Sequence, residues 1–214
     1  MKTRTVKPLY AVLAAVIASG YAGMAITAAP KEITDAEVLA VMRESFKESG
    51  IAKLDRLTQN ELQAACTAAN RARKDLDPAT RERLQKAALE SVKYPSDGKY
   101  LGDWKRGEQI AQSGRGLQFT DGPNTVNGGN CYACHQLTKE EISFGNIGPS
   151  LYNYGKLRGQ SEAILKYTWA RIWNSHAFNA CANMPRFGDA GILTEAQIKD
   201  VMALLLDPES PVNK

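Results

Sequence analysis

The stretch Cys131-Tyr132-Ala133-Cys134-His135 decides the fold of this chain. Two thiols lie two residues apart, and an imidazole follows directly after the second thiol. This spacing allows both thiols to add to the two vinyl groups of one haem, while the imidazole lies under the iron as an axial ligand. The pattern therefore predicts one covalently bound haem c, attached through Cys131 and Cys134 with His135 on the iron.

Two other uses of paired cysteines fit the sequence less well. A structural zinc site needs four ligands, and the remaining candidates Cys66, His176 and Cys181 are scattered without a second paired spacing. A thioredoxin-type redox site needs a βαβ context, which the sequence pattern does not contain. The residues therefore favour haem attachment over both.

The second axial ligand of the iron has two candidates. Met184 lies 49 residues after His135 and directly before Pro185, in a segment between two predicted helices. A thioether in such a loop can reach the iron, and the proline stiffens its approach. His176, just past the end of a predicted helix, is the competing ligand. The other methionines after the N-terminal region lie in helical patterns and are expected in the core: Met42 and Met202.

Residues 1–25 have the pattern of a secretory signal. Three basic residues precede an apolar run over residues 9–18, and the small residues Gly23 and Ala25 suit a signal peptidase. The run is short for a bilayer span, so an uncleaved membrane anchor is the second interpretation. Export agrees with covalent haem attachment, which takes place on the far side of the bacterial inner membrane. We therefore expect a periplasmic protein without stable membrane insertion after signal cleavage.

The charge of the mature chain argues against a nucleic-acid partner. The formal net charge is +4 at pH 7, and three of the basic residues lie in the expected signal, before the first acidic residue, Glu32. Removal of these three charges leaves a net charge near +1 and no basic stripe of the kind that binds nucleic acid. Any charged docking surface must therefore be local.

Residues 26–99 are predicted to form a helical extension before the haem domain. Capping boxes of the form T-x-x-E begin at Thr34 and at Thr58, each before an apolar periodic stretch. Asp77-Pro78 places a capping side chain before a proline at the first position of a third helix. The extension either pads the core or forms a partner-binding surface, and the residues favour neither role.

Residues 100–214 are predicted to form the haem domain. A short helix is expected from Asp103, followed by a glycine-rich loop over residues 114–129 that can pass close to a flat macrocycle. A second helix is expected from Ser161 to Ser175, and a final helix from Thr194 to Asp207. The final helix is expected to pack across the first, so the predicted fold class is all-α.

Two further stretches narrow the interpretation to one family. Gly145-Asn146-Ile147-Gly148-Pro149-Ser150-Leu151-Tyr152-Asn153-Tyr154-Gly155 follows the haem motif, and Met184-Pro185-Arg186-Phe187-Gly188 comes later in the chain. Together with the signal and the helical extension, they make the chain resemble the SoxX subunit of the SoxAX cytochromes of bacterial sulfur oxidation. The resemblance covers residues 104–206. Cys181, three residues before Met184, departs from the general cytochrome pattern.

The resemblance implies a cytochrome c-like domain with Met184 as the distal ligand. It also implies that the Pro149 carbonyl accepts the free N–H of His135 and so orients this ligand. The chain would be the electron-transfer subunit of an L-cysteine S-thiosulfotransferase, bound to a haem-containing SoxA-like subunit that performs the sulfur chemistry. A SoxYZ-like carrier protein would receive the thiosulfate, and a further cytochrome would accept the electrons. The alternative is a free-standing periplasmic electron carrier.

Cys66 and Cys181 remain outside the haem motif. An oxidising compartment tends to pair such thiols where the geometry allows, so we expect a disulfide that holds the extension over the Met184 side of the haem. The alternatives are two buried, inert thiols, or a Cys181 free to form a mixed disulfide. They stay open because a sequence does not fix the separation of two Cα atoms.

Overall fold

The computed structural model describes residues 33–214, so the predicted signal over residues 1–25 lies outside the described part. The chain divides into two compact units, Met1–Glu44 and Ser45–Lys214. Helix α2 (Asp35–Ser45) begins in the first unit. Its predicted capping box is confirmed, because Glu37 N–H donates to Thr34 Oγ1 over 3.3 Å and Thr34 N–H donates to Glu37 Oε2 over 2.9 Å.

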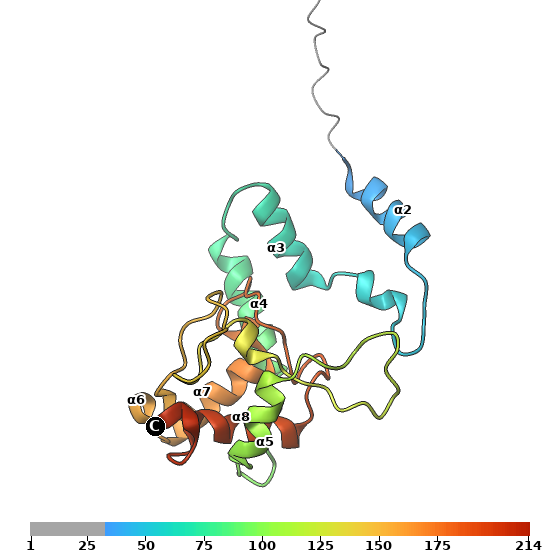
Figure 1. The fold of residues 1–214 in the computed structure, drawn as a ribbon. Helices are drawn as coiled ribbons and strands as arrows, with labels where there is room; N and C mark the ends of the chain where they lie inside the picture. The colour runs from blue at the N-terminus through green and yellow to red at the C-terminus, as the bar shows by residue number, and fades with distance from the viewer. Residues whose placement is uncertain (1–32) are drawn as a thin grey trace, which may run out of the picture. The chain divides into compact units, whose positions relative to one another are not determined.

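Helices α3 (Glu61–Arg71) and α4 (Pro78–Glu90) follow in the second unit (Figure 1). The predicted cap of α4 is confirmed, since the Asp77 side chain accepts a hydrogen bond from Thr80 N–H over 3.1 Å. Both helices belong to the same compact unit as the expected haem domain.

The predicted start of α3 is wrong by two residues. Thr58 and Glu61 do not form its capping box. Asn60 and Gln63 form it instead, with Gln63 N–H donating to Asn60 Oδ1 over 2.8 Å. The reason is that the Thr58 N–H closes the preceding 3₁₀ turn, η1 (Leu54–Leu57), on the carbonyl of Asp55.

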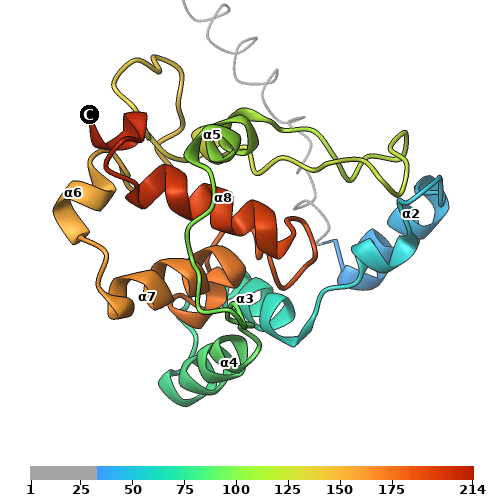
Figure 2. The ribbon, with the colours of Figure 1, turned by 90° about the horizontal axis from the view of Figure 1, so that it is seen from below.

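Helices α5 (Trp104–Gln112) and α8 (Glu195–Leu206) cross each other, as expected (Figures 1 and 2). Gly107 lies at this crossing. A Cβ atom at this position would overlap the carbonyl of Asp200 and lie 3.0 Å from Leu204 Cβ. The two backbones approach this closely because the glycine has no side chain.

Asp200 of α8 holds the start of α5 through hydrogen bonds and an ion pair. The Asp200 residue is buried, at 6% exposed. Arg106 donates to both carboxylate oxygens, each over 2.9 Å, and the Asp103 N–H donates to Oδ1 over 2.8 Å. A buried charge is stable only when it is paired in this way.

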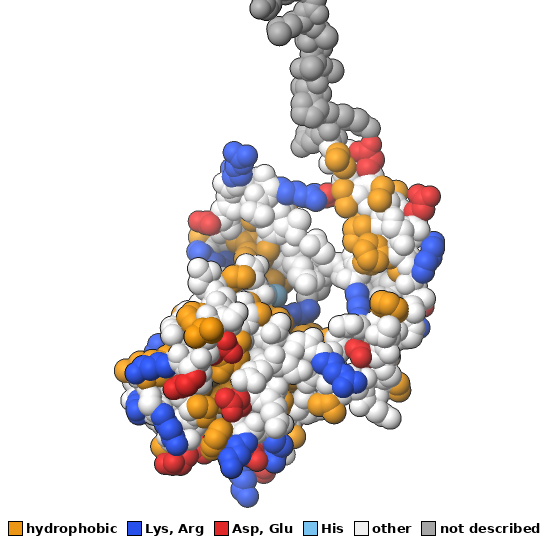
Figure 3. All heavy atoms as spheres, viewed as in Figure 1, with side chains coloured by type: hydrophobic (Ala, Val, Ile, Leu, Met, Phe, Trp, Pro, Cys, Tyr) orange, Lys and Arg blue, Asp and Glu red, His pale blue; other side chains and the backbone are white. Residues whose placement is uncertain are grey.

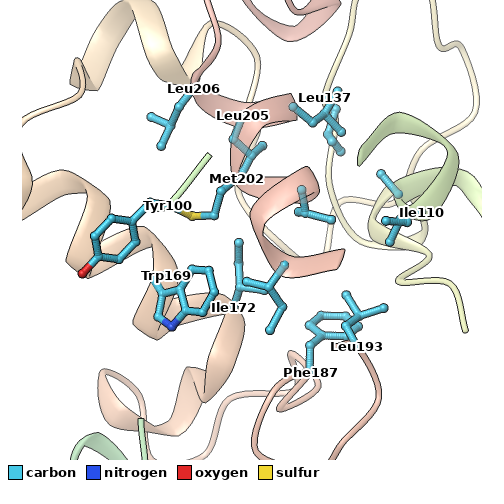
Figure 4. Packing of buried hydrophobic residues seen from close by; sticks show 14 of the residues in the cluster. Tyr100, Ile110, Leu137, Trp169, Ile172, Phe187, Leu193, Met202, Leu205 and Leu206 are labelled. Atoms are coloured by element: carbon cyan, nitrogen blue, oxygen red, sulfur yellow. The ribbon is translucent and has the colours of Figure 1, made fainter. Parts of the chain in front are cut away.

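The core lies between α5, α7 (Glu162–Trp173) and α8. Trp169 of α7 is fully buried, and its indole N–H donates to the carbonyl of Lys93 over 2.8 Å. Figure 4 shows how side chains from these helices and the neighbouring loops pack together: Tyr100, Ile110, Leu137, Trp169, Ile172, Phe187, Leu193, Met202, Leu205 and Leu206. Met202 is in the core, as expected. The same expectation is wrong for Met42, because α2 buries none of its residues.

The predicted all-α class is confirmed for the described part of the chain. Residues 33–214 contain helices, 3₁₀ turns and loops, and no strand beyond one isolated bridge between Ser49 and Ala52. The short helix α6 (Tyr154–Arg158) was not expected from the sequence. Among these residues, no helix combines the length and the apolar character that crossing a bilayer requires.

Candidate haem site

The C-x-x-C-H residues lie in one tight turn. Cys131–Ala133 form the 3₁₀ turn η2, which Asn130 enters in the left-handed conformation with φ of 46°. The N–H groups of Cys134 and His135 both donate to the carbonyl of Cys131, over 3.1 and 2.9 Å. Both thiols are free, and desolvation by the surrounding protein raises the pKa of Cys131 to about 12. The turn therefore presents two free thiols and one imidazole from neighbouring positions.

His135 is oriented by the backbone of Pro149. The distance between His135 Nδ1 and the Pro149 carbonyl oxygen is 2.7 Å. A carbonyl only accepts hydrogen bonds, so Nδ1 carries the proton. Nε2 is then the ring nitrogen that can offer a lone pair to a metal.

The segment that carries Pro149 runs beside the motif. Gly145 N–H donates to the carbonyl of Tyr132 over 2.8 Å, and Gly148 N–H donates to that of Cys134 over 2.9 Å. A Cβ atom at Gly148 would overlap the imidazole ring of His135. Glycine is therefore required for the backbone to pass this close to the ligand.

Met184 and His176 line the same pocket. The pocket has a volume of about 330 Å³, and Cys66, Cys181 and Arg186 also contribute to its wall. Met184 is partly buried and packs against the hydrophobic core. The two candidate distal ligands of the sequence are thus neighbours in the fold.

His176 is held inside the protein. Only 7% of the residue is exposed, and its Nε2 lies 3.1 Å from the carbonyl oxygen of Ala182. Burial lowers the pKa of His176, against the opposing effect of this hydrogen bond. The ring is therefore neutral at pH 7.

Cys66 and Cys181 are joined by a disulfide in the structure. Their Cα atoms are 5.6 Å apart, within the limit of about 7 Å for such a bond. Cys66 lies on α3, and Cys181 lies three residues before Met184. The bond therefore ties α3 to the loop that carries the candidate sulfur ligand.

The residues present fit a covalently bound haem. The turn supplies two free thiols, and His135 has an available lone pair. The indole N–H of Trp173 is buried without an acceptor among the described residues, so it can donate to a polar group of a bound molecule. Over residues 33–214, no three His, Cys, Asp or Glu side chains converge in one group.

Comparison with known proteins agrees with this geometry. Residues 119–207 match the family model Cytochrome c. These residues form a cytochrome c domain. The domain contains the haem motif, Pro149 and Met184, and it implies covalently bound haem c and a role in electron transfer.

The chain is also similar to a protein of Aquifex aeolicus (strain VF5) described as an uncharacterized lipoprotein. The two are 43% identical over 127 residues, which is 58% of this chain and 59% of the relative. The chain thus spans about three fifths of the length of the relative that it matches.

Three residues around the cytochrome c site were not assigned a role from the sequence. Gly148 packs on the His135 ring, Trp173 presents an unpaired donor, and Ser175 bonds to the Met184 carbonyl over 2.7 Å. The Gly-Pro pair was a usable signal for Gly148. Nothing in the sequence indicated the role of Ser175, because its hydrogen-bond partner, the Met184 carbonyl, lies in a separate loop.

Proposed function

We propose that this chain is a monohaem electron-transfer subunit of a SoxAX-like complex in the periplasm. In this complex, an L-cysteine S-thiosulfotransferase, a haem-containing SoxA-like partner performs the sulfur chemistry on a SoxYZ-like carrier protein. The haem of this chain supplies one-electron redox chemistry when bound, and a further cytochrome accepts the electrons. His135 and Met184 are the proposed axial ligands, with Pro149 orienting His135.

The use of the four cysteines is the observation that carries the proposal of one haem. Cys131 and Cys134 are free in the motif turn, while Cys66 and Cys181 are joined to each other. Each haem c needs two thiols, so one haem uses all the thiols that the disulfide leaves. None of the four cysteines then remains for sulfur transfer, which supports placing that chemistry on a partner.

An apolar surface beside the haem motif supports the proposal of a partner subunit. Ile142, Phe144 and Ile147 are 94%, 41% and 72% exposed. Their segment is hydrogen-bonded to the motif turn, and a hollow of about 490 Å³ beside them is lined by Phe144, Tyr132 and Ala133. Apolar groups gathered on a surface are typical of a protein interface.

The charges on one face of the molecule do not suggest a strongly charged partner. On the face shown in Figure 3, Lys and Arg side chains lie among Asp and Glu side chains. This mixture agrees with the expected net charge near +1 of the mature chain. Shape and apolar contact therefore matter more than long-range attraction in the proposed complex.

A membrane-tethered electron carrier is the second candidate, because the Aquifex aeolicus relative is described as a lipoprotein. Isolation of the native protein separates the candidates. A stable heterodimer with a second haem-staining chain supports the SoxAX-like role, and a haem-loaded monomer supports a free carrier. Partition of the native protein into a detergent phase supports a lipid tether.

The apolar surface can be tested in the isolated heterodimer. The double variant Ile142→Ser/Ile147→Ser should weaken association at least tenfold, since two exposed anchors are lost. Leu157→Ser is the matched control, because Leu157 is equally exposed, at 77%, but lies on α6. Equal association of both variants would argue against this surface as the interface.

A further inference from the structure

The loop that carries Met184 is held by the 3₁₀ turn η3 (Ser175–Ala177), directly after α7. Ser175 Oγ donates to the backbone carbonyl of Met184 over 2.7 Å, and Ser175 is fully buried. The hydroxyl thus fixes the backbone of the residue whose sulfur is the proposed ligand.

His176 fixes the same loop two residues earlier. The carbonyl of Ala182 only accepts, so His176 Nε2 carries a proton and donates to it over 3.1 Å. In this arrangement Nε2 has no lone pair for iron. The imidazole is instead a second support for the loop.

The turn that supports the loop is itself anchored. Asn174 Oδ1 accepts from His176 N–H over 3.2 Å, and Asn174 Nδ2 donates to Ser91 Oγ over 3.0 Å. Ser91 is the C-cap residue directly after α4, and its hydroxyl donates to the carbonyl of Ala88 over 2.8 Å. The support therefore continues into α4, and the turn cannot shift without breaking these bonds.

The far end of the loop is held by α7 as well. The N–H groups of Gly188 and Asp189 both donate to the carbonyl of Trp173, each over 3.1 Å. Met184 thus lies between Ala182, which the His176 side chain holds, and Gly188, which the carbonyl of the last residue of α7 holds. Opening the loop at Met184 requires loss of the Ser175 and His176 bonds.

We propose that Ser175 and His176 are positioning residues for the distal ligand: their hydrogen bonds to the carbonyls of Met184 and Ala182 keep the loop closed over the iron. They set how readily the iron loses its sulfur ligand, and neither residue touches the iron. This role rests on the proposed ligation by Met184.

Imidazole binding to the ferric holoprotein measures this loop opening. Free imidazole takes the sixth position only when the sulfur leaves, so its apparent affinity follows the fraction of open loop. Loss of one such hydrogen bond shifts an equilibrium by about tenfold, so Ser175→Ala should bind imidazole about tenfold more tightly. Ser175→Thr keeps a hydroxyl and should restore the affinity of the natural chain. His176→Leu removes the other donor and should also bind imidazole more tightly.

Two controls separate positioning of the ligand from general stability. Ser210→Ala removes another fully buried hydroxyl, which donates to the carbonyl of Leu204 in α8, and should leave imidazole binding unchanged. In a Met184→Ala background there is no sulfur to hold, so Ser175→Ala should have no further effect. A tighter imidazole affinity in that background would overturn the proposal.

Different experimental results would show that the positioning role is wrong and that Met184 ligation is wrong. If the natural chain shows the weak red absorption band of sulfur ligation, yet Ser175→Ala and His176→Leu bind imidazole no more tightly, the positioning role is overturned alone. If that band is absent from the natural chain, the Met184 ligation is overturned and this role with it. If Ser175→Ala does not accumulate as holoprotein, imidazole binding to His176→Leu tests the positioning role instead.

Discussion

At the scale of single residues, the haem chemistry depends on side chains that one turn brings together. The 3₁₀ turn η2 and the residues directly after it carry Cys131, Cys134 and His135. The hydrogen bond from His135 Nδ1 to the Pro149 carbonyl keeps the lone pair of the ring on Nε2. Gly148 is part of the same arrangement, because any side chain there would displace the imidazole. Different side chains attach the haem and bind the iron, so separate variants can test the two roles.

Replacement of both motif cysteines tests the attachment. The variant Cys131→Ala/Cys134→Ala lacks the thiols that form thioether bonds, so covalent haem staining after denaturing electrophoresis should disappear. The matched control Cys66→Ser/Cys181→Ser removes the same number of sulfur atoms and should keep its stain. Covalent staining of the motif variant would contradict the assignment.

The ferric spectrum tests the distal ligand. With His135 and Met184 on the iron, the haem should be low-spin and show the weak red charge-transfer band of sulfur ligation. Met184→Ala should lose this band, and its reduction potential should fall, because a thioether favours ferrous iron. His176→Ala should stay low-spin. The opposite pattern, with no band in the natural chain and loss of low-spin character in His176→Ala, would assign the site to His176.

At the scale of the elements, the crossing of α5 and α8 depends on one missing side chain. Gly107→Ala places a methyl group against the carbonyl of Asp200, and such overpacking costs about 1–3 kcal/mol. The free energy of unfolding in denaturant should fall by this amount. Gly122→Ala is the control, since a Cβ atom there meets nothing within 4 Å, and its free energy of unfolding should change little. Equal stability of the two variants would show that the helices tolerate separation.

At the scale of the whole molecule, one covalent bond joins parts that are far apart in the sequence. Cys66 and Cys181 are separated by 115 residues, and on the chain-entropy model such a bond stabilises by about 4–5 kcal/mol, less any strain. Cys66→Ser/Cys181→Ser should therefore unfold at a clearly lower denaturant concentration while keeping its haem. Mass analysis of the unreduced, alkylated natural chain provides the check on the bond, because alkylation at both cysteines would rule it out.

The sequence by itself determined the features that depend on near neighbours. The C-x-x-C-H spacing predicts the covalent chemistry because attachment needs only five consecutive residues. Caps at Thr34, Asp77 and Thr194 were predictable because a side chain bonds to a backbone N–H three residues later. The wrong prediction at Thr58 shows the limit of this reasoning, because the backbone N–H of Thr58 closes the preceding turn.

Only the tertiary structure decided the contacts around the distal loop. The sequence left the pairing of Cys66 with Cys181 open and offered both Met184 and His176 as ligands. The fold places Cys66 beside Cys181 and directs the His176 and Ser175 donors to backbone carbonyls. The physical reason is that these partners meet only after α3, α4 and α7 have packed, and a contact between distant segments leaves no local pattern in the chain.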